Sequence, residues 1–524
     1  MTEPVRNAVA PAWTARGRSM HWIVTLLVAV PLLVVAIVGL PLFQDGSSYL
    51  LELMTSQSAV RHHRYSMLLV QAPSIVALKL SALADLDPRS ALTVVRGIFS
   101  LSYAILPLVA LAWSWLLVRQ RDPAMMLWPV AAILLLNVVN FSGVSEILLA
   151  TQLAFPLVLA ASQRHPSRFA NTTILMLVPV ILLLHALVAV LYVGLACGMA
   201  LRARRLSERD ASRARLLAAL FGGAALIRLV LDAWLATDYE RSMWGGSALG
   251  DYFSMGFETA CFLAVATGSA LWFAGRREVL ERFIVVVSFG LTALMAWTAF
   301  RNLTGPRGLD EQPVQVLVLV GVTLIAMAVH AIRRPGGTKQ ISSTDRAVFV
   351  LLWSAVAAVI TRYTLLESFP LKTGATVLIA AALLVLAAFD STRDHPPIEV
   401  RRREHFVLNA AAVFAVLVLC KAAIWAAATA RLAQEMAAST VACAEIDDTS
   451  MDWVRRSPGA ILNNWSLPSL GLVSAPLRPP VLLLEAGDCG RFARSGEIVV
   501  DPWTVLTPRQ LPFVFGANPD ARDE

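Results

Sequence analysis

The residues whose types and spacing could do chemistry lie soon after the first hydrophobic span. Asp45 follows that span, which runs from His21 to Phe43. Next comes a basic cluster, after which the sequence turns apolar again: Arg61, His62, His63 and Arg64. A carboxylate beside fixed positive charge can activate a hydroxyl group and hold a lipid phosphate. Ionisable groups at membrane depth are costly and therefore indicate function, although an interfacial loop with snorkelling arginines accounts for the same residues without chemistry.

Three further ionisable residues are candidates for the same face of the membrane. Glu146 follows a short turn and opens an apolar segment, so we expect it to line one outward cavity with Asp45. An acid at a helix N-terminus is also favoured by the helix dipole alone, which is the structural alternative. His185 lies inside a long apolar run, where it either joins the rim of the cavity or packs as a core histidine. Arg241, in a polar loop, is one of several outer-face bases suited to a phosphate.

The composition identifies the class of protein that must position these groups. The chain has 524 residues, of which 57% are hydrophobic and 15% charged. Long unbroken apolar runs exclude the alternating pattern of a membrane barrel, so the fold class is an all-α polytopic membrane protein. The formal charge of +8 is spread in small groups between apolar spans. That distribution follows the positive-inside rule and does not indicate a nucleic-acid partner.

Two threadings of the chain through the membrane fit this pattern, and both give about thirteen spans. In one, Ser66–Ala84 crosses the membrane and Thr172–Leu201 crosses once. In the other, Ser66–Ala84 lies in the outer interface and Thr172–Leu201 crosses twice, turning near His185. The second is favoured because it places every short arginine-rich loop on one side. It predicts a cytoplasmic N-terminus, a first outer loop over residues 44–91, and a transmembrane domain over residues 1–430.

The remaining residues, 431–524, are predicted to form a small α/β domain on the periplasmic or extracellular side of the membrane. Val481–Leu484 and Ile498–Val500 have the composition of short strands. Cys443 and Cys489 both fall in this region and could form a disulfide in an oxidising compartment. Within the transmembrane domain, Arg228 and Asp232 are spaced four apart and are predicted to pair on one helix. No cysteine and histidine spacing resembles a zinc site.

The layout of the first third of the chain resembles the GT-C superfamily of integral-membrane glycosyltransferases, in particular the aminoarabinose and protein mannosyl transferases. Asp45 lies in Gln44-Asp45-Gly46-Ser47-Ser48-Tyr49, directly after the first span, as an acid does in that family. An apolar interfacial segment, an arginine at Arg96 and a second acid in Ser145-Glu146-Ile147 follow in the family's order. The chain departs from the family's pattern in lacking a second acid next to Asp45 and in carrying Glu as the later acid.

The resemblance implies transfer of a sugar from a polyprenyl-phosphate donor to an envelope glycan, lipid or protein at the outer face of the cell inner membrane. It implies catalytic roles for Asp45 and Glu146, and substrate binding by the basic residues and histidines named above. No cofactor is indicated, and a divalent metal is left open. The main alternative is a multi-pass transporter or flippase of lipid-linked envelope precursors, which would favour inverted repeats and polar midplane residues. A lipid-linked polymerase or ligase, and a subunit without chemistry, are further alternatives.

Overall fold

The computed structural model describes the following residues: 13–42, 45–57, 64–118, 144, 146–163, 166–185, 188–204, 208–235, parts of 408–436, 443–445, 467–474, 482–484, 488–501 and 504–515. They are mostly helical and belong to two compact units. The first contains Met1–Leu184, Asp390–Ser457 and Ile461–Glu524. The second contains His185–Phe389 with Pro458–Ala460.

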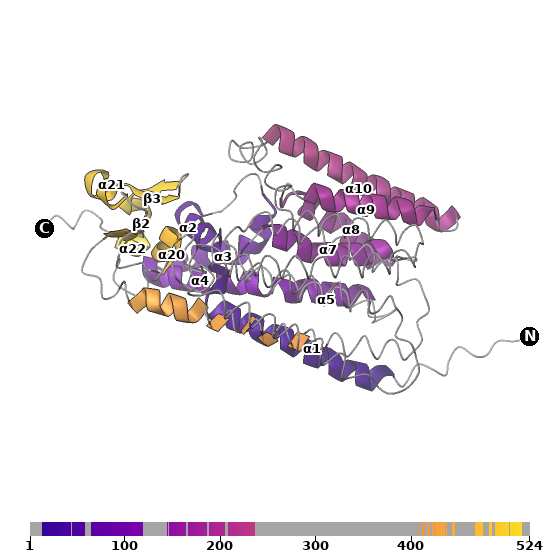
Figure 1. The fold of residues 1–524 in the computed structure, drawn as a ribbon, viewed down its shortest axis with the longest axis horizontal. Coiled ribbons are helices and arrows are strands. Elements are labelled where there is room, and N and C mark those ends of the chain that lie inside the picture. Colours follow the sequence, from indigo (N-terminus) through magenta and orange to yellow (C-terminus); the bar gives the residue numbers. More distant parts are fainter. Residues whose placement is uncertain are drawn as a thin grey trace, which may run out of the picture. The chain divides into compact units, whose positions relative to one another are not determined.

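The N-terminal part of the first unit is a set of packed helices (Figure 1). Helix α3 packs against α4, α1 packs against α4, and α7 packs against both α5 and α8. Their bounds are as follows: α1 Trp13–Ile37, the 3-10 turn η1 Leu40–Leu42, α2 Asp45–Ser56, α3 Met67–Leu83, α4 Pro88–Ala104, α5 Leu106–Val118, α7 Glu146–Ser162 and α8 Arg168–Leu182. The described part of residues 44–91, predicted as an outer loop, is therefore largely helical.

Helices α3 and α4 are joined by a short turn whose sequence dictates its geometry. Asp87 caps α4 by accepting hydrogen bonds from the backbone N–H groups of Arg89 and Ser90, and Pro88 takes the first helical position that suits it. Hydrogen bonds from Ser90, first its side chain and then its backbone, hold the pKa of Asp87 below its ordinary value. Helix α3 has 17 residues, or about 25 Å, which is shorter than a bilayer core of about 30 Å.

The connection from α1 to α2 is compact because two glycines permit it. Gly39 adopts a φ of +71°, a conformation that glycine reaches without the strain a Cβ atom would cause. A Cβ atom on Gly46 would lie 1.7 Å from the carbonyl oxygen of Pro41, so no other residue fits there without displacing the backbone. The Trp425 indole donates a hydrogen bond to the carbonyl oxygen of Val38 at 3.1 Å. Helix α2 packs against η1, which in turn packs against α1.

The second unit contains α9 (Val188–Ala203) and α10 (Glu208–Leu235). Helix α8 ends at Leu182 and α9 begins at Val188, so the long apolar run is interrupted near His185 as the favoured threading predicts. Arg228 and Asp232 form the predicted ion pair within α10. By length and composition, two of the described helical stretches can cross a membrane, Pro88–Leu117 and Ala211–Leu235. The count of thirteen spans stays a prediction.

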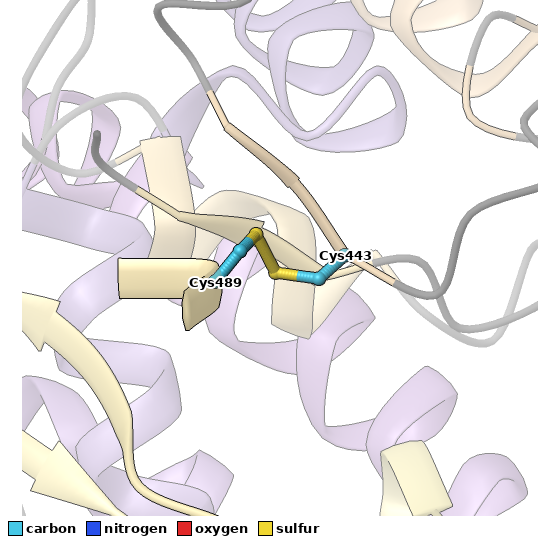
Figure 2. The surroundings of a disulfide bond; sticks show 2 residues. All are labelled: Cys443 and Cys489. Atoms are coloured by element: carbon cyan, nitrogen blue, oxygen red, sulfur yellow. A yellow bond between two sulfur atoms is a disulfide. The ribbon is translucent and has the colours of Figure 1, made fainter. Parts of the chain in front are cut away.

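The C-terminal region, which we define as residues 443–515, mixes short strands and helices, and all of its described residues belong to the first unit. Strands β1 (Cys443–Glu445) and β2 (Leu482–Leu484) pair in parallel, and β3 (Ile498–Asp501) and β4 (Thr504–Leu506) pair in antiparallel. The helical elements are α20 Leu467–Val473, α21 Asp488–Ser495, η6 Pro508–Gln510 and α22 Pro512–Phe515. Cys443 and Cys489 form a disulfide (Figure 2). The predicted strands are thus confirmed, and the two cysteines that the sequence left open as a possible pair are joined.

Candidate functional site

The candidate site is built around the carboxylate of Glu146, the first residue of α7. Glu146 is only 3% exposed. Its Oε1 atom accepts a hydrogen bond from the Tyr49 hydroxyl and another from Arg64 Nη1 at 2.7 Å. A carboxylate so deeply buried is stable only when it is paired and hydrogen-bonded. Arg64 supplies the opposite charge, and Tyr49 supplies the neutral donor.

Three segments that are far apart in the sequence meet at this carboxylate. Tyr49 comes from α2, Arg64 from the start of the turn before α3, and Glu146 from α7. The tyrosine is 97 residues from the glutamate and the arginine is 82 residues from it. Tyr49 is 4% exposed, and the Arg64 side chain is 13% exposed. These contacts therefore fix α2 and the entry to α3 against α7.

Asp45 is the first residue of α2, so its backbone lies one helical turn before Tyr49. The next residue, Gly46, packs closely on Val144, because a Cβ atom on Gly46 would lie 3.2 Å from Val144 Cγ2. Val144 is two residues before Glu146. The first turn of α2 therefore lies beside the segment that delivers Glu146, and the two acidic positions belong to one region of the first unit.

Further buried polar groups surround the cluster. Tyr103, on α4, lies close enough to Glu146 for their electrostatic interaction to matter, and its hydroxyl is beside the Gln71 side chain of α3. Gln71 is fully buried, and the rings of Tyr103 and Phe99 contact each other at 4.8 Å between centroids. The cluster therefore involves α2, α3, α4 and α7. A buried tyrosine, glutamine and glutamate can together orient hydroxyl-bearing groups and hold protons in defined places.

The structure brings Arg64 and Glu146 together. The other predicted binding residues belong to the second unit or lie outside the described residues. Arg64 contacts Glu146, a partnership that the sequence did not predict, and its proposed role at a phosphate stays a prediction. His185 belongs to the second unit, where its carbonyl oxygen accepts a hydrogen bond from the Val188 N–H at 3.1 Å. The remaining predicted binding residues lie outside the described residues: Arg61, His62, His63 and Arg241.

Sequence reasoning missed Tyr49 and Gly46 as members of the site. The signal for Gly46 was its place directly after an acid at the end of an apolar span. Tyr49 follows Asp45 at i+4, the spacing of residues on one helix face. Nothing in the sequence indicated which distant acid the tyrosine would meet. Among the described residues, no three histidine, cysteine or acidic side chains gather closely enough to hold a metal ion.

Comparisons with known proteins identify no relative of this chain. No protein-family model matches the chain, and no curated protein and no solved structure matches it either. The resemblance to membrane glycosyltransferases therefore stays a prediction from the residues that carry it.

Proposed function

We propose that the protein is a membrane glycosyltransferase that moves a sugar from a polyprenyl-phosphate donor to an envelope acceptor at the outer face of the cell inner membrane. The observation that carries the proposal is the buried cluster of Tyr49, Arg64 and Glu146. This cluster fixes in place the helix that begins at Asp45. A carboxylate at the head of a helix that is held this firmly suits acid–base chemistry, which depends on exact placement of the base.

In the proposed reaction, the acceptor hydroxyl attacks the anomeric carbon of the donor sugar. The bond between that carbon and the phosphate oxygen breaks, and a bond between the carbon and the acceptor oxygen forms. Asp45 takes the proton of the acceptor hydroxyl. The polyprenyl phosphate leaves with the electron pair of the broken bond, and nearby cationic side chains stabilise its charge. The basic residues 61–63 are the proposed source of that charge.

Glu146 acts in this scheme as a positioning residue. Its carboxylate is already occupied by Tyr49 and Arg64, and it is nearly inaccessible. A group in that state holds its neighbours better than it exchanges protons with a substrate. We therefore assign to Glu146 the task of fixing α2, and through α2 the place of Asp45. From the sequence we expected both acids to be catalytic. We now propose a catalytic role for Asp45 alone.

The disulfide supports the proposed sidedness of the reaction. Structural disulfides persist in oxidising compartments and are rare in the cytosol. The Cys443–Cys489 bond lies in the C-terminal region, and α20 of that region packs against α2. If the C-terminal region is periplasmic, then α2 and Asp45 lie on the same outer side, where lipid-linked sugars are consumed in this proposal. The N-terminus would then be cytoplasmic.

The proposal is tested by replacing Asp45 in cells that lack the wild-type gene. We expect Asp45→Asn to reduce transfer by about 10²-fold or more, because a general base contributes 10²–10⁴-fold. The melting temperature should stay within about 2 °C of wild type, the usual range for a change that does not disturb packing. Mass spectrometry of envelope glycans and lipids should show loss of one sugar from the acceptor and accumulation of a polyprenyl-phosphate sugar.

Asp85→Asn is the matched control, because Asp85 is an exposed acid in the turn between α3 and α4 and asparagine tolerates its positive φ of 50°. This control should retain full transfer. Wild-type glycosylation in cells carrying Asp45→Asn would contradict the proposed catalytic role.

A transporter would give a different result, since the lipid-linked precursor would then accumulate only in the inner leaflet, where a membrane-impermeant periodate probe added outside cannot reach it.

A further inference from the structure

Helix α20 of the C-terminal region packs against α2, the helix that carries Asp45 and Tyr49. All seven residues of α20 are buried, and α20 packs against α2, β2 and β3. Ser469 Oγ of α20 and Ser48 Oγ of α2 lie 3.0 Å apart, and each serine is 1% exposed or less. Ser48 directly precedes Tyr49. A hydrogen bond between two buried hydroxyls therefore joins the C-terminal region to the residue beside the one that binds Glu146.

The Cys443–Cys489 disulfide restrains α20 indirectly, through strands β1 and β2. Strand β1 pairs with β2 at Cys443 and Leu482, and the disulfide joins β1 to α21, which follows β2 in the chain (Figure 2). A parallel pair of three-residue strands has little stability of its own. The cross-link closes a loop of 46 residues, which removes much of the entropy that would otherwise separate the two strands. Because β2 packs on α20, the disulfide limits the movement of α20 as well.

A second contact joins the C-terminal region to the N-terminal helices independently of α20. Helix α22 packs against α4, and Arg89 Nη2 donates a hydrogen bond to the carbonyl oxygen of Val514 at 3.4 Å. Loss of the α20 contact would therefore loosen α2 without detaching the C-terminal region. This separation allows the effect on α2 to be measured by itself.

We propose that α20, secured by the Cys443–Cys489 disulfide, is a positioning element for α2, and that Ser469 is its positioning residue. A continuous series of contacts runs from the disulfide through β2 and α20 to Ser48, and then along α2 to Asp45 and Tyr49. The expected loss of sugar transfer when this contact is broken rests on the proposed function. The expected loosening of α2 does not depend on that function. Full activity accordingly requires the oxidised C-terminal region.

Hydrogen–deuterium exchange of the full-length protein in lipid nanodiscs tests the proposal. We expect Cys443→Ser/Cys489→Ser to speed amide exchange in residues 45–56 by roughly tenfold, while α7 and α8 exchange at the wild-type rate. Ser469→Ala and Ser48→Ala should each speed exchange in the same residues. Their double variant should add little to either, because both remove the same hydrogen bond. Cys197→Ser, which removes an exposed free cysteine in α9, is the control and should change nothing.

Activity provides a second measurement that a merely structural role would not move. The cysteine double variant should lose about tenfold in kcat with little change in KM, since a misplaced base slows the chemical step more than binding. Unchanged exchange in residues 45–56 would overturn the proposal, and so would equal acceleration of α2, α7 and α8. If wild-type protein transfers no sugar, the proposed function fails, and the exchange experiment still decides whether α20 positions α2.

Discussion

Two largely buried pairs of arginine and carboxylate among the described residues differ in how far apart their partners lie in the sequence. On α10, Arg228 pairs with Asp232 one helical turn later. In the first unit, Arg64 pairs with Glu146 across 82 residues, and Tyr49 joins them from a third segment. The first pair neutralises charge within a single helix whose backbone hydrogen bonds do not depend on it. The second pair holds separate elements together, so its loss should affect tertiary structure and activity.

The largest effect is expected from Glu146→Ala, which removes the carboxylate shared by Tyr49 and Arg64. Tyr49 and Arg64 then each lose a hydrogen bond to this carboxylate, and removing one member of a buried ion pair costs about 3–5 kcal/mol. We expect a marked fall in melting temperature, measured by scanning fluorimetry of the detergent-solubilised protein, together with loss of sugar transfer. A melting temperature equal to that of wild type would show that the three-segment cluster does not hold the elements together.

Gly46→Ala should have the next largest effect. The new Cβ atom would lie 1.7 Å from the Pro41 carbonyl oxygen, and a backbone atom cannot move aside as a flexible side chain can. We expect a loss of about 3 kcal/mol and displacement of the first turn of α2. Thermal unfolding measures the loss of stability, and faster amide exchange at residues 45–49 measures the displacement. Preserved stability would mean that the turn between α1 and α2 can relax, contrary to its tight geometry.

Asp232→Ala should cost less than Glu146→Ala. It leaves Arg228, which is 5% exposed, without its local carboxylate, and we expect a loss of about 1–3 kcal/mol. The helix itself should persist, and sugar transfer should stay near wild type. Circular dichroism and a transfer assay on the same preparation would check both points. A loss of transfer equal to that of Glu146→Ala would erase the distinction between the local pair and the long-range pair.

The smallest effect, and the only gain, is expected from Gly223→Ala in α10. Among the described residues, no atom outside the adjacent backbone of α10 lies within 4 Å of the Cβ position that alanine would add there. Alanine in a helix interior is more favourable than glycine by about 0.5–1 kcal/mol. We expect a small rise in melting temperature, in contrast to the fall for the same substitution at Gly46. A loss at both positions would indicate that α10 is packed more tightly there than its described neighbours indicate.

The sequence by itself determined the features that depend on near neighbours. The i, i+4 spacing predicted the pair of Arg228 and Asp232, and the apolar run predicted an interruption near His185. The composition of residues 481–484 and 498–500 predicted strands, and two cysteines in one polar region made a disulfide possible. Each of these is set by local geometry or by a small number of possible partners. The same local signals showed Glu146 opening a helix.

The tertiary structure alone decided which distant groups meet. It paired Glu146 with Arg64 and Tyr49, it required glycine at position 46, and it placed α20 against Ser48. Contacts of this kind depend on how whole helices pack, and many partners satisfy the same spacing in the sequence. A buried carboxylate must find donors somewhere, because its desolvation is costly. The sequence shows that a buried carboxylate would need such donors. Only the packing of the helices decides that Tyr49 and Arg64 provide them.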